Sequence, residues 1–153
     1  MIAIGSDHGG FGLKEEIKKY LSEQGYPIKD FGVESTASVD YPDVAHPVCM
    51  SVVNGECEKG ILICGTGIGI SMAANKVHGI RAALCGDCFS ARMAKEHNNA
   101  NVIALGGRVI GSDLAKEIVN AWLKAEFQGG RHQNRVNKIH ILEEKRKGEG
   151  KDE

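Results

Sequence analysis

The segment Gly60-Ile61-Leu62-Ile63-Cys64-Gly65-Thr66-Gly67-Ile68-Gly69 is the most informative part of the chain. Its first four residues have the length and composition of a buried β-strand. The glycines that follow allow a sharp turn and a close approach of the backbone to a ligand. Because residues 70–76 are compatible with a helix, N–H groups near its start are available to an anion. A cysteine in such a setting can supply a thiolate, so the segment predicts chemistry as well as a strand.

Apolar strand-like runs alternate with amphipathic segments along the whole chain. The expected strands are residues 2–4, 28–31, 60–63, 81–84 and 102–105. The expected helices are one that begins near Leu13 and ends before Gly25 and Pro27, then 42–53, 71–76, 89–97 and 112–127, with Ser112 as the N-cap of the last. This alternation favours right-handed βαβ units. We therefore expect an α/β fold, a doubly wound sandwich with a five-stranded parallel sheet.

In a sheet of this kind, ligands bind at the carboxyl ends of the strands. The sequence places four short loops at those ends: Asp7-His8, Cys64 to Gly69, Cys85 to Cys88, and Gly106-Gly107-Arg108. Most of the candidate chemistry lies in these loops.

Composition limits the classes of function. The 153 residues fit one domain, which we expect to span residues 1–142 and to include a basic C-terminal helix after Gly129-Gly130; residues 143–153 read as a charged, disordered tail. A net charge of −1 and 5% aromatic residues argue against nucleic-acid binding. No membrane span or signal peptide is visible, and five cysteines without a signal favour free thiols, so we expect a cytoplasmic protein.

The cysteines allow more than one interpretation. The residue type alone favours a buried core cysteine at position 64. The position of Cys64 directly before the glycine loop favours a functional thiol. Cys85 and Cys88 have the spacing of a thiol–disulfide pair or of half a zinc site. A zinc site needs two further ligands and no second cysteine pair exists, so we expect no metal site.

The glycine loop itself is a poor match to nucleotide-binding motifs. The third glycine position of a dinucleotide fingerprint holds Ile70, and the lysine of a P-loop is missing. Binding of a smaller anion by backbone N–H groups remains open.

Several polar side chains also have two interpretations. Asp7 suits a helix N-cap, and His8 suits either a solvated loop or an acid–base or phosphate contact near Cys64. His97 can complement a helix dipole or act as a general acid. Arg131 and Arg135 are four residues apart and would share a helical face, which suits capture of a phosphate.

Taken together, these motifs resemble the ribose-5-phosphate isomerase B family, which also includes the galactose-6-phosphate isomerase subunits. The resemblance covers Met1 to about Leu142 and rests on seven segments: Gly5–Phe11, Val39–Asp43, Cys64–Gly69, Ala73–Lys76, Gly79–Ala82, His97-Asn98 and Gly129–Gln133. It implies a Rossmann-like three-layer α/β/α sandwich, a homodimer or dimer of dimers with active sites shared between subunits, and isomerisation of a phosphorylated sugar in carbohydrate metabolism through an enediolate, without metal or organic cofactor.

The resemblance also implies roles for individual residues. Cys64 would be the base, because the position at which some members carry a glutamate holds Ile70 here. Thr66 would relay a proton between O1 and O2, His97 would open the furanose ring, and Asp7 would assist at the anomeric hydroxyl.

The implied binding residues fall into three groups. Backbone N–H groups would form the anion hole, from Gly65, Thr66, Gly67, Ile68, Gly69 and Ile70. Tyr41 and Asn98 would contact the sugar. The phosphate would be held by His8, Arg108, Arg131 and Arg135, some of them from the partner subunit.

The sequence leaves three alternatives open. The substrate could be a hexose 6-phosphate, of galactose or allose, in place of ribose 5-phosphate. The chain could bind a phosphosugar without turning it over. It could also be a thiol redox protein that uses Cys85 and Cys88.

Overall fold

A computed structural model of the chain describes residues 1–149 and has a parallel sheet at its centre. Within these residues the sheet has five strands in the order β2-β1-β3-β5-β4, and every pairing is parallel. The strands are β1 (Ile2–Ser6), β2 (Ile28–Asp30), β3 (Lys59–Cys64), β4 (Ala82–Leu84) and β5 (Val102–Gly106).

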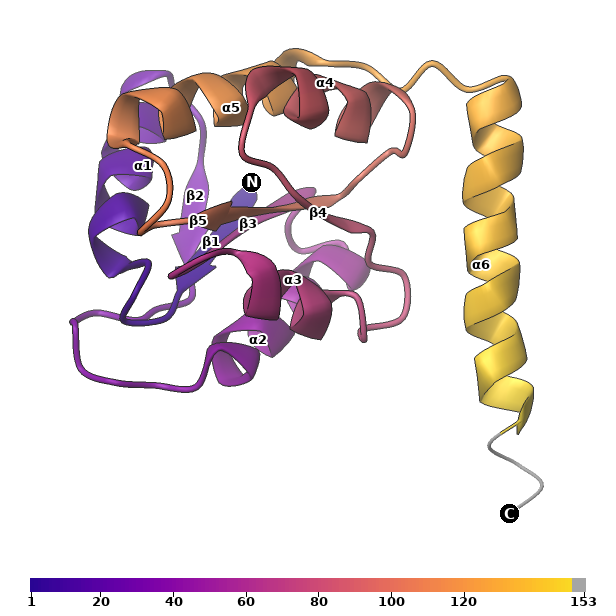
Figure 1. Ribbon diagram of the computed structural model, residues 1–153, viewed down its shortest axis with the longest axis horizontal. Coiled ribbons are helices and arrows are strands. Elements are labelled where there is room, and N and C mark those ends of the chain that lie inside the picture. The colour runs from indigo at the N-terminus through magenta and orange to yellow at the C-terminus, as the bar shows by residue number, and fades with distance from the viewer. Residues whose placement is uncertain (150–153) are drawn as a thin grey trace.

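Helices cover both faces of the sheet (Figure 1). They are α1 (Phe11–Glu23), α2 (Tyr41–Val53), α3 (Ile68–Ala74), α4 (Cys88–Glu96), α5 (Ser112–Lys124) and α6 (Arg131–Glu149). Alternate residues of each strand point to opposite faces, so Ile61 and Ile63 pack under α1, α4 and α5, whereas Leu62 and Cys64 pack against α2 and α3. The expected Rossmann-like three-layer sandwich with a five-stranded parallel sheet is confirmed.

Two expected helix starts differ from the structure. Helix α3 begins at Ile68, three residues earlier than expected, because Gly67 takes a left-handed conformation (φ 80°) at its N-cap. Helix α5 has Gly111, in extended backbone, as its N-cap, so Ser112 lies in the first turn. The prediction of Ser112 as the cap was therefore wrong by one residue, and no side chain caps this helix.

Helix α6 stands apart from the sandwich (Figure 1). The expected basic helix after Gly129-Gly130 is present, but it continues to Glu149, so residues 143–149 are helical and not disordered as we expected. One reason is that Glu143 accepts hydrogen bonds from the Gly79 amide, at 3.2 and 3.3 Å. Residues 150–153 of the expected tail lie outside the described residues.

The direction of the chain separates two edges of the sheet. The strands end near Ser6, Cys64 and Gly106 at one edge, because β1, β3 and β5 are in register there. Helix α4 runs back from that edge, and its C-cap His97 lies shortly before β5 begins at Val102. A strand of this length spans roughly 15–20 Å, so His97 and Cys64 lie at opposite edges.

Candidate active site

Cys64 is the last residue of β3 and is 4% exposed. Its Sγ accepts a hydrogen bond from the Gly67 amide at 3.1 Å, which fixes the direction of the thiol. The carbonyl oxygen of Cys64 accepts from the Gly107 amide at 2.8 Å. The thiol is thus held at the carboxyl edge of the sheet between the ends of β3 and β5, where ligands bind in this architecture.

Three loops pack tightly around this thiol through glycines. A Cβ placed at Gly10 would lie 2.5 Å from the Ile63 carbonyl oxygen, and one at Gly107 would lie 2.8 Å from that of Gly9. Only a residue without a side chain lets the backbones approach so closely. The result is a backbone-lined surface beside Cys64.

The loop after Cys64 provides the expected anion-binding backbone only in part. Gly67 already donates its N–H to Cys64 Sγ, and Ile68 donates to Thr66 Oγ1 at 3.2 Å. Thr66 is exposed and Ile68 is 47% exposed, so both face open space. Ile70 is fully buried in the core, so its side chain takes no part in the site.

Asp7 and His8 follow β1 at the same edge. Asp7 is 6% exposed, and its Oδ1 accepts from the Gly10 amide at 3.1 Å. Because Gly10 itself is the N-cap of α1, Asp7 stabilises the turn before the helix and does not cap it. His8 is half-buried, and its Nδ1 accepts from the Val39 amide at 3.2 Å.

Tyr41 and Arg108 complete this edge. A Cβ placed at Gly69 would lie 2.6 Å from Tyr41 Cζ, so the phenol ring packs directly on the start of α3. The Arg108 amide donates to the Gly65 carbonyl at 2.9 Å, and its guanidinium lies beside Gly65. Arg108 is exposed and its charge is available to a ligand.

The remaining predicted residues lie together, but at the amino edge of the sheet. His97 is half-buried, and Asn98, Arg131 and Arg135 are exposed. Arg131 and Arg135 lie in the first two turns of α6 and share a face, as the spacing predicted. The structure therefore forms two groups, which we call the thiol group (Asp7, His8, Tyr41, the loop from Cys64 to Ile70, and Arg108) and the histidine–arginine group (His97, Asn98, Arg131 and Arg135).

His132 joins the second group and was not singled out as a site residue from the sequence. Its ring stacks on that of His97 with centroids 4.1 Å apart and planes 10° from parallel, and it is only 6% exposed. Burial, together with His97, Arg131 and Arg135, lowers the pKa of His132 below its usual value. The position beside Arg131 in the Gly-Gly-Arg-His segment was the one available signal.

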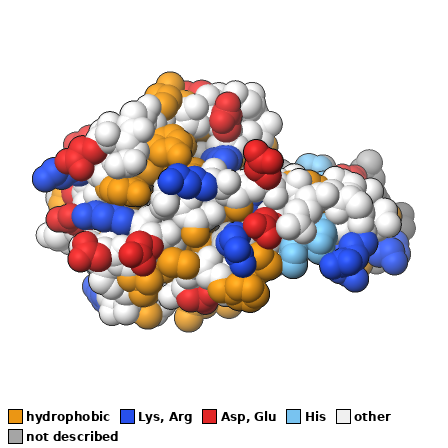
Figure 2. All heavy atoms as spheres, turned by 90° about the horizontal axis from the view of Figure 1, so that it is seen from above, with side chains coloured by type: hydrophobic (Ala, Val, Ile, Leu, Met, Phe, Trp, Pro, Cys, Tyr) orange, Lys and Arg blue, Asp and Glu red, His pale blue; other side chains and the backbone are white. Residues whose placement is uncertain are grey.

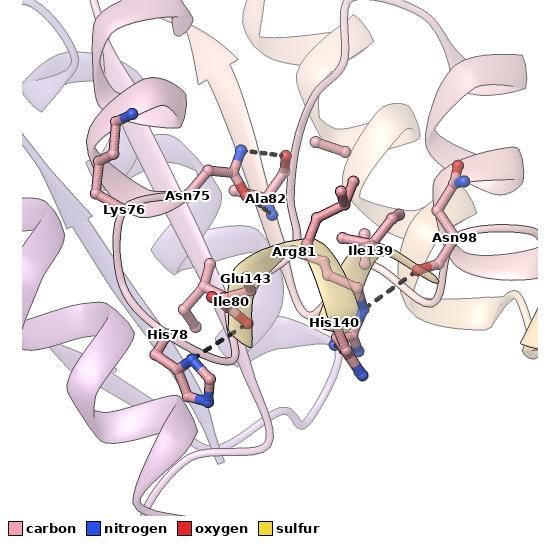
Figure 3. Close-up of a pocket in the computed structure, with 13 residues that line it drawn as sticks. Asn75, Lys76, His78, Ile80, Arg81, Ala82, Asn98, Ile139, His140 and Glu143 are labelled. Carbon is pink, nitrogen blue, oxygen red and sulfur yellow. Dashed lines mark hydrogen bonds and ion pairs between the residues drawn. The ribbon is translucent and has the colours of Figure 1, made fainter. Parts of the chain in front are cut away.

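Arg81 is a second residue that the sequence did not assign to a site. Its guanidinium donates to the carbonyl oxygens of Asn98 and Asn99, at 3.3 Å from Nε and 2.8 Å from Nη2 respectively, and Nη1 lies 3.0 Å from His140 Nε2. Arg81 thus connects the turn after His97 to the middle of α6 (Figure 3).

A cavity of about 830 Å³ lies where α6 meets the body (Figure 3). Its lining includes Ile80, Arg81, Ile139 and Glu143, and none of the thiol group. A second cavity of about 700 Å³ includes Tyr41, Gly69 and Met72. Figure 2 shows histidine and basic side chains gathered where the narrow end of the molecule, formed by α6, joins the body.

The described residues do not favour a thiol redox protein or a metal site. Cys85 is 2% exposed, and burial raises the pKa of its thiol to about 11, which is unfavourable for a redox nucleophile. All five cysteines are free. Between Met1 and Glu149 no cluster of three or more His, Cys, Asp or Glu side chains could hold a metal ion, and no helix is long and apolar enough to cross a membrane.

Comparisons with known proteins show the family of the chain. The model of the Ribose/Galactose Isomerase family matches residues 2–139. Ribose-5-phosphate isomerase B of Escherichia coli is 52% identical over 145 residues, which are 95% of this chain and 97% of that protein. D-erythrulose-4-phosphate isomerase of Pectobacterium atrosepticum is 49% identical over 147 residues, which are 95% of this chain and 97% of that one.

A solved structure gives the same result for the fold. Ribose-5-phosphate isomerase B of Clostridium thermocellum superimposes with a TM-score of 0.93 at 60% identity, covering 94% of this chain and 97% of that one. The family match spans both the thiol group and the histidine–arginine group, and relatives of this identity cover almost the whole chain. The chain therefore belongs to the ribose/galactose isomerase family.

Proposed function

We propose that this protein interconverts ribose 5-phosphate and ribulose 5-phosphate through an enediolate, with Cys64 as the base. The observation that carries the proposal is the Cys64 thiol, held by the Gly67 amide at the carboxyl edge of the sheet between Asp7-His8 and Arg108. The names of the Escherichia coli and Clostridium thermocellum relatives support this substrate.

The proposed chemistry moves two protons within the sugar. Cys64, as thiolate, removes the proton from C2 of the open-chain aldose, and the electron pair forms the C1–C2 double bond of the enediolate. The same proton returns to C1, and Thr66 passes the O2 proton to O1, so that no atom is gained or lost. Free N–H groups of the glycine loop stabilise the negative oxygen, which is a large contribution in sites of this type, while His8 and Arg108 bind the phosphate.

Ring opening and part of the phosphate grip require the histidine–arginine group, which lies at the other edge of the same chain. We infer that a second copy supplies it, so that the protein works as a homodimer, or a dimer of dimers, with two shared sites. His97 of one copy would then protonate the ring oxygen, while Asn98, Arg131 and Arg135 bind the hydroxyls and the phosphate. Exposed apolar side chains on α6, namely Ile139, Ile141 and Leu142, are available for such an interface.

The candidate substrates differ mainly in the length of the sugar chain. A hexose 6-phosphate was the alternative from the sequence, and the name of the Pectobacterium relative adds a four-carbon ketose phosphate. The same acid–base groups serve all three, since only the distance from the reacting carbons to the phosphate differs. Free thiols throughout the chain fit a reducing compartment, and we propose a cytoplasmic location.

The test is a kinetic panel with the purified protein in the presence of a chelator. We expect kcat/KM for ribose 5-phosphate to exceed the values for galactose, allose and erythrulose phosphates by at least about tenfold, the usual effect of a misplaced binding group. Faster turnover of another sugar would reassign the substrate, and binding without turnover of any would overturn the proposed activity.

A further inference from the structure

We propose that Lys14 is a positioning residue for substrate binding: its buried ammonium anchors the segment 31–40, and through Val39 this segment sets the tautomer and direction of His8. The proposal rests on the proposed function of His8 as a phosphate ligand. It assigns a role to an interior charge that the isomerisation chemistry does not use.

Lys14 lies in the first turn of α1 with its side chain 0% exposed. Its Nζ is 2.9 Å from both carboxylate oxygens of Asp30 and also donates to the carbonyl oxygen of Val33. The Phe11 ring centroid is 5.4 Å from the same nitrogen. A fully buried lysine is rare and is tolerated only when its charge is paired and its donors are satisfied, so this ammonium has a defined place.

The ammonium closes a bend at the end of β2. Asp30 Oδ1 also accepts from the Gly32 amide at 2.8 Å, so Asp30 and Val33 both point back to Lys14. The bend is paired with the end of β1, because the Ser6 amide donates to the Gly32 carbonyl at 2.7 Å and the Val33 amide donates to the Ser6 carbonyl at 2.9 Å. Ser6 is two residues before His8, so the near end of the segment is fixed beside the site.

The far end of the segment reaches His8 directly. Between the bend and α2, residues 34–38 are exposed and form no helix or strand. The Val39 amide then donates to His8 Nδ1 at 3.2 Å. A ring nitrogen that accepts a hydrogen bond carries no proton, so His8 is held as the tautomer with its proton on Nε2. In that tautomer the Nε2–H group donates a hydrogen bond to a phosphate oxygen.

These contacts form one path from Lys14 to the phosphate ligand. Without the ammonium, the Val33 carbonyl loses its buried partner, and the start of the segment shifts because it is then held mainly by its hydrogen bonds to Ser6. Val39 then no longer holds His8 in one tautomer, and part of the imidazole population presents an acceptor to the phosphate. The expected effect is on binding of the phosphorylated sugar and not on proton transfer at Cys64.

The experiment compares Lys14→Met with Lys18→Met in the full-length protein. Lys18 is the matched control, because it also binds Asp30, at 2.7 Å, but is 31% exposed and has no bond to Val33. We expect Lys14→Met to raise KM for ribose 5-phosphate about tenfold, the usual effect of one lost hydrogen bond to a charged group, with kcat within about threefold, which is the pattern of lost binding. Lys18→Met should leave both constants within about twofold.

A second variant tests the path even if Lys14→Met folds poorly. Val39→Pro removes the N–H that donates to His8 and also fixes φ at this position, and it should raise KM to the same extent. The double variant with Lys14→Met and Val39→Pro should have a KM no higher than that of either single variant, because both substitutions act through one hydrogen bond. ¹⁵N chemical shifts of the His8 ring report the tautomer directly, and we expect the Nε2–H form in the unmodified protein and a mixture in both variants.

An unchanged His8 tautomer in Lys14→Met or in Val39→Pro would overturn the proposal, and so would additive effects of the two substitutions on KM. His8→Ala separates this result from a failure of the proposed function. If His8→Ala leaves KM unchanged while the tautomer responds to Lys14→Met, the assignment of His8 to the phosphate is wrong and the positioning path stands.

Discussion

The thiol of Cys64 illustrates how a single residue is prepared by its neighbours. The Gly67 amide donates to its sulfur, the Gly107 amide donates to its carbonyl, and the glycines of the neighbouring loops let those backbones pack closely beside it. None of the other four cysteines precedes a glycine loop of this kind. The backbone groups that face the sulfur therefore distinguish Cys64 from the other cysteines.

We expect Cys64→Ala to lower kcat by about a hundredfold to ten-thousandfold, because a positioned general base contributes 10²–10⁴-fold to proton transfer. Cys88→Ser is the control, since Cys88 is half-buried at the start of α4 and belongs to neither group of the site. Steady-state rates with ribose 5-phosphate give the answer. A rate near that of the unmodified protein in Cys64→Ala would remove this thiol from the mechanism.

Two of the buried cysteines, Cys49 and Cys85, should be chemically silent at neutral pH. Burial raises the pKa of Cys49 to about 12 and that of Cys85 to about 11. At pH 8 their thiolate fractions are on the order of 10⁻⁴ and 10⁻³, and only the thiolate is alkylated. Mass spectrometry after iodoacetamide treatment of the folded protein should find Cys49 and Cys85 unmodified, with labelling appearing only above about pH 10. Rapid labelling of either one at pH 8 would contradict the burial of these thiols.

At the scale of elements, the start of α3 is tightly constrained. Gly67 combines a φ of 80° with a position where a Cβ would lie 2.5 Å from Leu84 Cδ1 and 2.9 Å from the Leu105 carbonyl carbon. A side chain here conflicts with the backbone conformation and with the packing of β5 at once.

We therefore expect Gly67→Ala to lower the free energy of unfolding by about 2–4 kcal/mol, the sum of left-handed strain and overpacking. Gly12→Ala is the matched control, because Gly12 lies within α1 and nothing is within 4 Å of a Cβ placed there. That substitution should raise stability by about 0.5–1 kcal/mol through helix propensity. Urea titrations measure both. Equal effects of the two substitutions would show that the conformation of Gly67 is not required.

The elements themselves followed well from the sequence, because each depends on a local pattern. The apolar runs at Ile2 and Ile61 are long enough to define buried strands, and the alternation with helices determines the parallel sheet. The start of α3 was missed since Gly67 and Ile68 carry no helix signal until the left-handed turn is seen. The length of α6 was missed because Glu143 is held by Gly79, a contact 64 residues away in sequence.

The site was predictable only as a set of residues. Loop position identified Cys64, Asp7, His8 and Arg108, which the sheet brings to one edge. The stacking of His132 on His97 and the bond from Val39 to His8 join distant segments, and no local pattern encodes them.

At the scale of the whole molecule, one chain carries the thiol group and the histidine–arginine group at opposite edges of its sheet. If a second copy completes each site, a mixture of two inactive variants should regain activity. We expect Cys64→Ala and His97→Ala each to be nearly inactive as pure proteins. After mixing, dissociation and reassociation, each mixed dimer holds one site with both native groups and one site with neither.

Equal mixing gives mixed dimers in half of the population, so the recovered rate should approach about a quarter of the unmodified value by symmetry of the pairing. Size-exclusion chromatography before and after mixing provides the control for assembly. No recovery despite proven exchange of subunits would mean that a single chain completes its own site.

The separation of the two groups has a consequence for the timing of activity during synthesis. If a second copy completes each site, as we propose, a newly made chain that is folded but alone has a thiol without its ring-opening acid, so it does not turn over sugar until it meets another copy. While such chains are scarce, the rate of appearance of active enzyme rises with the square of their concentration. In a protein with shared sites, activity begins with an encounter between two finished molecules and not with the folding of one.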